Sequence, residues 1–333
     1  MASDGIGVFG LMPDGDEVYS LRLAGGRIAV EVLTFGAVLG DIRIDGRSTV
    51  LGCDTLEDYV TRSPYFGAIV GRCANRIARG RLVIDGETHH LTLNEGGRTH
   101  LHGGATGFSH RNWSLASHDQ RSVTLRLVSK DGDQGYPGRV VATCRYALVG
   151  AAGLEVSLEA VTDRPTALNL ANHSYFNLSD EDVVDGHEVA IAASHHLTVD
   201  GDLIPTGAIA DVEGTRFDFR EPRRLGPERY DTPFVIDIQA VMEPRPVASV
   251  FAPKTGLRLD VASTQASLQF YTGQQLKPGT PGRGGRRYGP GAGLCLETQG
   301  YPDAPNHPDF PSVMLRPGET YRHVTRYAFS TPR

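Results

Sequence analysis

The stretch VVATCRYALVGAAGLEVSLEAV, residues 140–161, contains two β-favouring runs joined by a turn. The runs Val140–Leu148 and Leu154–Val161 are rich in valine and leucine, and Gly150-Ala151-Ala152-Gly153 separates them. Short runs of this kind, bounded by Gly, Asp or Asn, are typical of antiparallel strands. The stretch therefore predicts a strand, a tight connection and a second strand.

Similar runs follow one another through most of the chain. They are Val18–Leu23, Ile28–Thr34, Val38–Ile44, Leu82–Ile84 and Val123–Leu127. Turn residues lie between them, and the chain contains 40 Gly and 20 Pro. Long amphipathic helices are missing, although Thr55–Thr61 is suited to a short one with Asp54 or Thr55 as its N-cap. The sequence predicts an all-β fold, a large antiparallel β-sandwich with very little helix. No segment has the composition of a linker, so we expect a single domain over residues 1–333.

The composition limits the class of protein. Hydrophobic residues make up 40% of the chain, enough for a sizeable core, and the formal net charge is −6. A nucleic-acid partner would favour a basic face, so we expect none. No run of 18 apolar residues occurs, and Met1–Asp16 lacks the basic and apolar parts of a signal peptide, so we expect no membrane partner. No exposed apolar stripe can be identified, which makes a monomer the default expectation.

The cysteines and histidines show no metal-binding spacing. The cysteines are scattered at Cys53, Cys73, Cys144 and Cys295. The absence of a C-x-x-C pair favours reduced, buried thiols in a cytoplasmic protein. The adjacent pairs His89-His90 and His195-His196 lie in strand-like stretches, where neighbours point to opposite faces, so neither pair can hold one ion. We therefore expect no metal and no cofactor.

Two ionisable residues stand in apolar runs. Glu297 follows Leu294-Cys295-Leu296, and on a strand it shares one face with Cys295. His173 stands in the strand-like run Leu168–Phe176. A buried carboxylate is costly unless it is paired or used, and general acid–base catalysis needs one acid and one base. A structural hydrogen bond within the core is the alternative, and the pattern alone does not decide between the two.

Two further segments carry polar side chains suited to a ligand. Gly71–Gly80 contains Asn75 and Arg76, whose amide and guanidinium groups can read adjacent hydroxyls, unless they form a surface ion-pair cluster. His102 precedes Gly103-Gly104, which lets the backbone come close to a ligand, unless the segment is a plain turn.

A third segment and a loop lie closer to Glu297. On a strand, Gln269 shares a face with Tyr271. A sheet face lined in this way suggests a neutral polyol, such as a sugar. The stretch Lys277–Gly293 holds seven Gly and three arginines and is predicted to be a loop. A loop of this length beside a site is often functional, and a solvated insertion without a role is the alternative.

Seven segments, in order along the chain, resemble the aldose 1-epimerases, the galactose mutarotase family. They are GRCANRIARG (71–80), LHGG (101–104), NLANHSYFNL (169–178), IPTG (204–207), QFYTG (269–273), LETQGYPDAPN (296–306) and LRPGETY (315–321). The resemblance runs from about Phe9 to Phe329. It implies a β-sandwich of the galactose mutarotase type with a sugar cleft on one sheet. It also implies an enzyme that interconverts the α and β anomers of free aldoses without a cofactor.

The resemblance implies roles for individual residues. Glu297 would be the general base that takes the proton from the C1 hydroxyl, and His173 the general acid that protonates the ring oxygen. The substrate-binding residues would be Asn75, Arg76, His102, Asp231 and Gln269. Two positions depart from the family pattern. Thr232 stands where the family has a histidine, which bears on the sugar preference, and Ala266 stands where a proline is common.

Other activities remain as alternatives. A glycoside hydrolase could use Glu297 and Asp231 as its two carboxylates. A non-catalytic sugar-binding protein could keep the cleft, although it would be expected to lose Glu297 or His173. An epimerase acting on a hexose phosphate could grip the phosphate with the arginines of the predicted loop, which are Arg283, Arg286 and Arg287.

Overall fold

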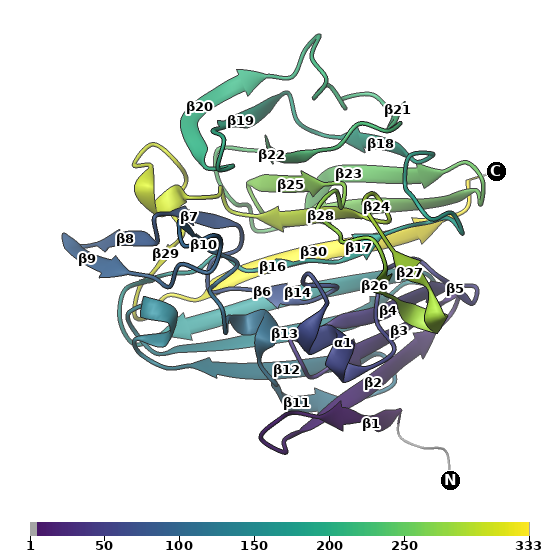
Figure 1. The fold of residues 1–333 in the computed structure, drawn as a ribbon, viewed down its shortest axis with the longest axis horizontal. Coiled ribbons are helices and arrows are strands. Elements are labelled where there is room, and N and C mark those ends of the chain that lie inside the picture. The colour runs from purple at the N-terminus through teal and green to yellow at the C-terminus, as the bar shows by residue number, and fades with distance from the viewer. Residues whose placement is uncertain (1–4, 333) are drawn as a thin grey trace.

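The computed structural model describes residues 5–332, which are folded almost entirely into antiparallel strands (Figure 1). The stretch that opens the sequence argument forms β13 (Val140–Val149) and β14 (Gly153–Thr162), paired in register from Val149↔Gly153 to Val140↔Thr162. Their valines and leucines alternate with polar residues, as a sheet with one buried face requires.

These two strands belong to a nine-stranded sheet with the order β11-β12-β13-β14-β30-β24-β23-β18-β21. Its other strands are β11 (Ser114–His118), β12 (Ser122–Ser129), β18 (Glu188–Ile191), β21 (Arg223–Arg224), β23 (Arg245–Ala252), β24 (Leu257–Ser263) and β30 (Tyr321–Ser330). The C-terminal strand β30 is central in this sheet, between β14 and β24.

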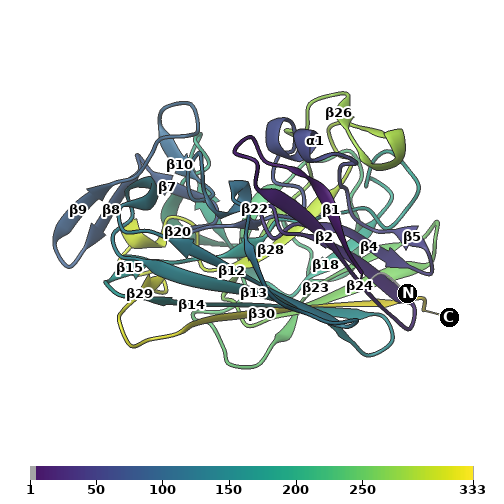
Figure 2. The same ribbon diagram turned by 90° about the horizontal axis from the view of Figure 1, so that it is seen from below.

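Two smaller sheets complete the sandwich. A six-stranded sheet has the order β17 (Tyr175–Phe176), β28 (Leu294–Gln299), β25 (Ser267–Tyr271), β22 (Asp231–Val235), β19 (His195–Val199) and β20 (Pro205–Asp211). A five-stranded sheet has the order β1 (Ile6–Leu11), β2 (Glu17–Gly25), β3 (Ile28–Leu33), β4 (Leu39–Ile44) and β5 (Arg47–Ser48). Figure 2 shows the nine-stranded sheet as the lower layer and strands of the other two sheets above it.

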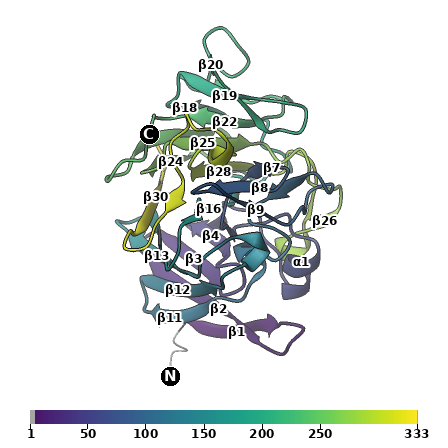
Figure 3. The ribbon, with the colours of Figure 1, turned by 90° about the vertical axis from the view of Figure 1, so that its left-hand side faces the viewer.

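Short two-stranded pairs and helical turns lie outside these three sheets. The two-stranded pairs are β6 (Ile69–Val70) with β16 (Ala171–Asn172), β7 (Arg76–Ala78) with β10 (Thr99–Leu101), β8 (Arg81–Ile84) with β9 (Glu87–His90), β15 (Thr166–Ala167) with β29 (Met314–Leu315), and β26 (Thr280–Pro281) with β27 (Arg287–Tyr288). The helical turns are α1 (Leu56–Thr61), η1 (Phe108–His110), η2 (Asp133–Gly135), η3 (Arg283–Gly285) and η4 (Ala304–Asn306). The β8–β9 hairpin lies at one end of the molecule in Figure 1 and faces the viewer in Figure 3.

One hydrophobic core joins the three large sheets. Its buried members include Leu21 and Val30 from the five-stranded sheet, Leu125 and Leu158 from the nine-stranded sheet, and Leu268, Phe270, Leu294 and Leu296 from the six-stranded sheet. Apolar area removed from water contributes roughly 25 cal/mol per Å², so a core of this extent is the main force that holds the layers together. The predicted all-β sandwich is confirmed, as is the short helix: the Thr55 side chain caps α1 by accepting from the Asp58 N–H.

Two local predictions were wrong. Lys277–Gly293 is not an irregular loop, because β26 and β27 pair within it around η3. Strands of two residues are too short for an alternating pattern to show. The run Leu168–Phe176 is not one strand either, since β16 pairs with β6 whereas β17 pairs with β28. His173 lies between the two, where the chain passes from one sheet to the other.

The four cysteines are free and buried, as predicted. None of the helices between residues 5 and 332 is long and apolar enough to span a membrane.

Candidate active site

Three neighbouring strands of the six-stranded sheet present polar side chains on one face. Glu297 on β28 lies directly opposite Gln269 on β25, and Gln269 is paired in turn with Pro233 on β22. Asp231, two residues before Pro233, shares this face, and the Gln269 amide donates to its Oδ1 at 2.5 Å. Alternation along the strands, with Leu268 and Phe270 in the core behind, fixes this arrangement.

His173 reaches the same face from the break between β16 and β17. Its N–H donates to the carbonyl of Ala68 (2.8 Å), and its carbonyl accepts from the Gly67 N–H (3.0 Å). The backbone is therefore fixed although it belongs to no strand. The imidazole Nε2 lies 3.6 Å from Glu297 Oε1, and the ring stacks on Tyr175 with centroids 5.0 Å apart.

The β7–β10 hairpin supplies the opposite wall. Leu101 pairs with Arg76, which places His102 beside Asn75. The Asn75 N–H donates to His102 Nδ1 at 3.2 Å, and the His102 N–H donates to the Asn75 carbonyl at 3.0 Å. Both residues have positive φ, of 62° and 50°, a conformation that is rare outside glycine and common at functional sites. Gly103 is required next, since a Cβ there would lie 1.7 Å from the Gly71 carbonyl oxygen.

All seven predicted site residues line one pocket, with a volume of about 130 Å³. They are Asn75, Arg76, His102, His173, Asp231, Gln269 and Glu297. Six further residues complete the lining: Pro64, Tyr65, Leu101, Tyr175, Tyr271 and Gln275. Oε2 of Glu297 and Oε1 of Gln269 are buried and have no hydrogen-bond partner in the described chain, so both can accept from a ligand.

Burial sets the protonation of the catalytic candidates. Glu297 is 2% exposed, and burial together with the charge of Asp231 raises its pKa well above 4.5. Burial lowers the pKa of His173 to about 4. Burial thus shifts the two pKa values in opposite directions, which inverts their usual order and favours the neutral form of both groups.

His102, His173 and Glu297 each offer a ligand atom within 4.8 Å of the others, which makes them a possible metal cluster. The tautomer of His102 makes this residue a poor ligand for a metal ion. Its Nδ1 accepts the Asn75 N–H, so the neutral ring carries its proton on Nε2, the atom that would have to bind the ion. The same arrangement makes His102 Nε2–H a hydrogen-bond donor to a ligand.

Two contributors were not predicted from the sequence. Glu95 holds Arg76 through two hydrogen bonds, to Nε at 2.8 Å and to Nη2 at 2.7 Å, and also accepts from Thr99. Tyr65 packs against His102 with centroids 4.7 Å apart and the rings tilted by 56°. Both lie in irregular segments outside any periodic pattern. Arg76 can therefore form an ion pair with Glu95 and still donate a hydrogen bond to a sugar hydroxyl, because Glu95 orients the guanidinium within the pocket wall.

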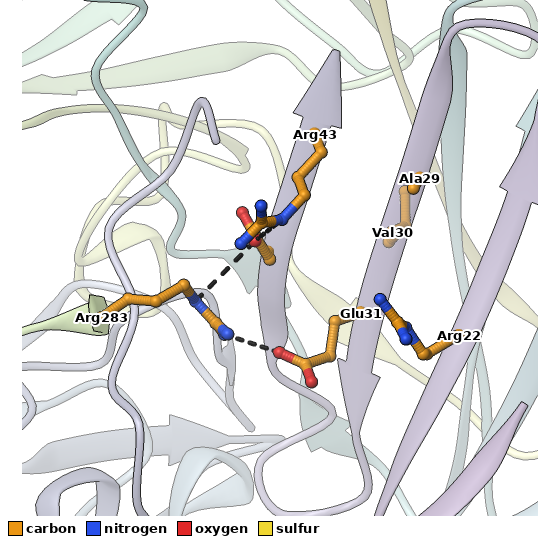
Figure 4. A pocket seen from close by; sticks show the side chains of 7 residues that line it. Arg22, Ala29, Val30, Glu31, Arg43 and Arg283 are labelled. Carbon is orange, nitrogen blue, oxygen red and sulfur yellow. Dashed lines mark hydrogen bonds and ion pairs between the residues drawn. The ribbon is translucent and has the colours of Figure 1, made fainter. Parts of the chain in front are cut away.

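A second, larger hollow of about 270 Å³ lies on the five-stranded sheet, away from these residues. Figure 4 shows Arg283 reaching toward Glu31, where Nη2 and Oε2 are 2.6 Å apart. Its Nε lies 3.8 Å from Asp41, which also pairs with Arg43. Glu31, Asp41, Arg43 and Arg283 of this hollow therefore pair with one another. Arg286 and Arg287 also lie outside the catalytic pocket, so the arginines of the 277–293 segment give no support to a phosphate site there.

Thr232 departs from the family pattern on the far side of β22. It alternates with Asp231 and shares its face with Phe234, which packs in the core. The residue is buried and does not line the pocket. The substitution therefore changes the support behind Asp231, and it leaves the ligand-facing wall unchanged.

Comparisons with known proteins show the family and agree with the fold. The family model described as aldose 1-epimerase matches residues 19–328. The galactose mutarotase of Rattus norvegicus is 41% identical over 97% of both chains, and the aldose 1-epimerase of Escherichia coli K12 is 39% identical over 96% of this chain and 97% of its own. The crystal structure of an aldose epimerase homologue from C. elegans superposes with a TM-score of 0.88 at 30% identity, covering 94% of this chain and 99% of that one. The chain belongs to the aldose 1-epimerase family.

Proposed function

We propose that this protein interconverts the α and β anomers of free aldoses by opening and closing the hemiacetal ring. The observation that carries the proposal is the pairing of His173 and Glu297, one acid and one base, whose reactive atoms lie 3.6 Å apart in a pocket that is also lined by Arg76, Asp231 and Gln269. Relatives named galactose mutarotase and aldose 1-epimerase are 39–41% identical to this chain over 96–97% of its length.

The lining suits a neutral sugar. Asp231 and the free Oε1 of Gln269 accept hydrogen bonds from hydroxyls, and Arg76 and His102 Nε2–H donate them. Tyr65 and Tyr175 offer aromatic faces to the apolar side of a ring. Which aldose fits best depends on these few polar contacts, each of which costs about 1–3 kcal/mol when it is left unpaired.

The reaction needs one proton on the catalytic pair. In the free site the inverted pKa order places that proton on Glu297. We propose that sugar binding moves it to Nε2 of His173, so that the ionised Glu297 accepts the O1 proton while His173 protonates the ring oxygen. Rotation about C1–C2 and closure on the other carbonyl face, with both proton transfers reversed, give the second anomer. Each such transfer contributes on the order of 10²–10⁴ in rate.

Polarimetry tests the proposal directly. Freshly dissolved α-D-galactose and α-D-glucose are followed with the protein, with E297Q and without protein. We expect the wild type to speed the decay to the same final rotation, and E297Q to lose that acceleration. The same preparations are incubated with nitrophenyl galactosides. Release of nitrophenol without any effect on rotation would replace the proposal with a hydrolase.

We also infer that the protein acts as a cytoplasmic monomer. Free, buried cysteines suit a reducing compartment. Sedimentation velocity at micromolar concentration, with polarimetry on the same sample, tests the oligomeric state of the active species.

A further inference from the structure

Both ends of the His173 imidazole face the same strand. Nδ1 lies 3.5 Å from Sγ of Cys295, and Nε2 lies 3.6 Å from Oε1 of Glu297. Cys295 and Glu297 are two residues apart on β28 and therefore share its face. Tyr65 and Tyr175 stack on the ring at interplanar angles of 26° and 24°. The plane of the ring is set by stacking, and its rotation within that plane by the thiol and the carboxyl group.

Cys295 is fully buried, and its thiol makes no other hydrogen bond in the described part of the chain. Burial, with the charges of Glu297 and Asp231, raises the pKa of Cys295 well above 9. The group is therefore a neutral thiol, unsuited to serve as a nucleophile or metal ligand. A neutral thiol can still accept a weak hydrogen bond.

The proposed acid cycle makes a specific demand on Nδ1. When His173 gives its Nε2 proton to the ring oxygen, the remaining imidazole proton must stay on Nδ1, so that Nε2 is free to take the proton back. A carboxylate beside Nδ1 would hold that proton firmly, but it would also raise the pKa of the imidazolium and make it a weaker acid. A neutral thiol holds the ring in place with little effect on the pKa of the imidazolium.

We infer that Cys295 is a positioning residue for the reaction, whose Sγ accepts the Nδ1–H of His173 and keeps Nε2 directed at the sugar. The inference rests on the acid role proposed for His173. It assigns one function to each of the two buried residues that contact the ring edge: Glu297 exchanges the proton, and Cys295 fixes the tautomer.

Substitution of Cys295 separates this role from simple packing. C295A removes the acceptor, and C295S restores one of similar size. C144A is the matched control, because Cys144 is also fully buried but lies on β13 in the hydrophobic core. We expect C295A to lower kcat at least tenfold with KM within about threefold, C295S to recover most of kcat, and C144A to leave kcat unchanged.

Nitrogen-15 NMR of histidine-labelled protein reads the contact without turnover. The His173 signals, identified by their loss in H173N, should show a protonated Nδ1 and an unprotonated Nε2 at pH 7 in the wild type, and a shift toward the other tautomer in C295A. Wild-type protein with the proton on Nε2, or equal kcat in C295A and C144A, would overturn the inference. An expected NMR pattern in a protein that does not speed mutarotation would leave the contact intact and remove the proposed function instead.

Discussion

Asp231 and Glu297 are two carboxyl groups on one sheet face, separated by the strand that carries Gln269. Burial is the main cause of the raised pKa of Glu297, and the charge of Asp231 is the next. Burial raises the pKa of Asp231 as well. Asp231, which the family resemblance implies binds a sugar hydroxyl, thus has a second effect. Its charge favours the protonated form of the Glu297 carboxyl group up to a higher pH.

This effect predicts how D231N changes the pH profile. The pair works with one proton, so kcat/KM should fall on the alkaline side when Glu297 loses it and on the acid side when His173 gains a second one. Removing the Asp231 charge should move the midpoint of the alkaline fall in kcat/KM to lower pH. Weaker sugar binding in D231N would lower kcat/KM at every pH without moving this midpoint. D211N, an exposed carboxylate on β20, is the control and should leave the midpoint in place. A flat wild-type profile from pH 5 to 9 would contradict the one-proton scheme.

Removing either member of the pair should abolish most of the activity. E297Q keeps the volume of its side chain and H173N keeps a polar side chain, but neither can exchange the proton. We expect each to reduce kcat by at least about 10², with circular dichroism and thermal unfolding still those of a folded protein. Near-normal turnover in either variant would remove the role assigned to that residue.

E297Q should also be more stable than the wild type at neutral and alkaline pH. The folded-state pKa of Glu297 is raised, so the neutral carboxyl favours folding below about 4.5, and that advantage is lost as the pH rises toward the folded-state value. Each pH unit in this window costs about 1.4 kcal/mol. Urea unfolding should give E297Q a free energy of unfolding about 1–3 kcal/mol higher than that of the wild type at pH 8. The difference should vanish near pH 4.5. A less stable E297Q at pH 8 would show that the carboxylate is well solvated or paired.

The sequence predicts the sandwich because strands of five or more residues display their alternation, as β13, β14 and β12 do. Through the family resemblance it also predicts seven of the residues that line the pocket, including Glu297 and Gln269, but it misses others such as Gln275. It does not predict Glu95 or Tyr65, since their roles depend on contacts between segments distant in sequence.

Protonation is the other property that the sequence could not supply. From their ordinary pKa values, Glu297 is expected to be ionised and His173 to need a carboxylate to hold its proton. Burial reverses this order, and burial depends on the whole fold.

Acid should destabilise the protein through its buried histidines. Burial lowers the pKa to about 4 at four of them, His100, His173, His187 and His323. The unfolded chain takes up these protons from about pH 6.5 downward and the folded chain does not, so stability present above pH 6.5 is lost between there and pH 4. Each group costs about 2 kcal/mol by pH 5.

The measurement is the free energy of unfolding at several pH values, made in E297Q because Glu297 acts in the opposite direction. The fall between pH 7 and 5 should be several kcal/mol, because these four histidines and His102, whose pKa burial lowers well below 6.5, each contribute up to about 2 kcal/mol. H187Q removes one of these groups and should reduce the fall by about 2 kcal/mol. A stability that does not change over this range would mean that these rings are protonated in the folded state.

Arg283 should be needed for stability and not for catalysis. Its guanidinium contacts Glu31 at 2.6 Å and the Gly40 carbonyl at 2.8 Å, and lies 3.8 Å from Asp41, whose side chain is only 4% exposed. R283A removes one partner from each of these acceptors, while Asp41 keeps Arg43 and Ser48 and Glu31 keeps Ser20, so it should cost about 1–3 kcal/mol in the free energy of unfolding. Because Arg283 is outside the catalytic pocket, kcat per folded molecule should stay within about twofold of the wild type.

R287A is the matched control: its guanidinium is in the same segment, is exposed and contacts only the Gly279 carbonyl, so it should change stability by less than about 0.5 kcal/mol. A large loss of kcat in folded R283A would mean that the 277–293 segment takes part in the reaction after all.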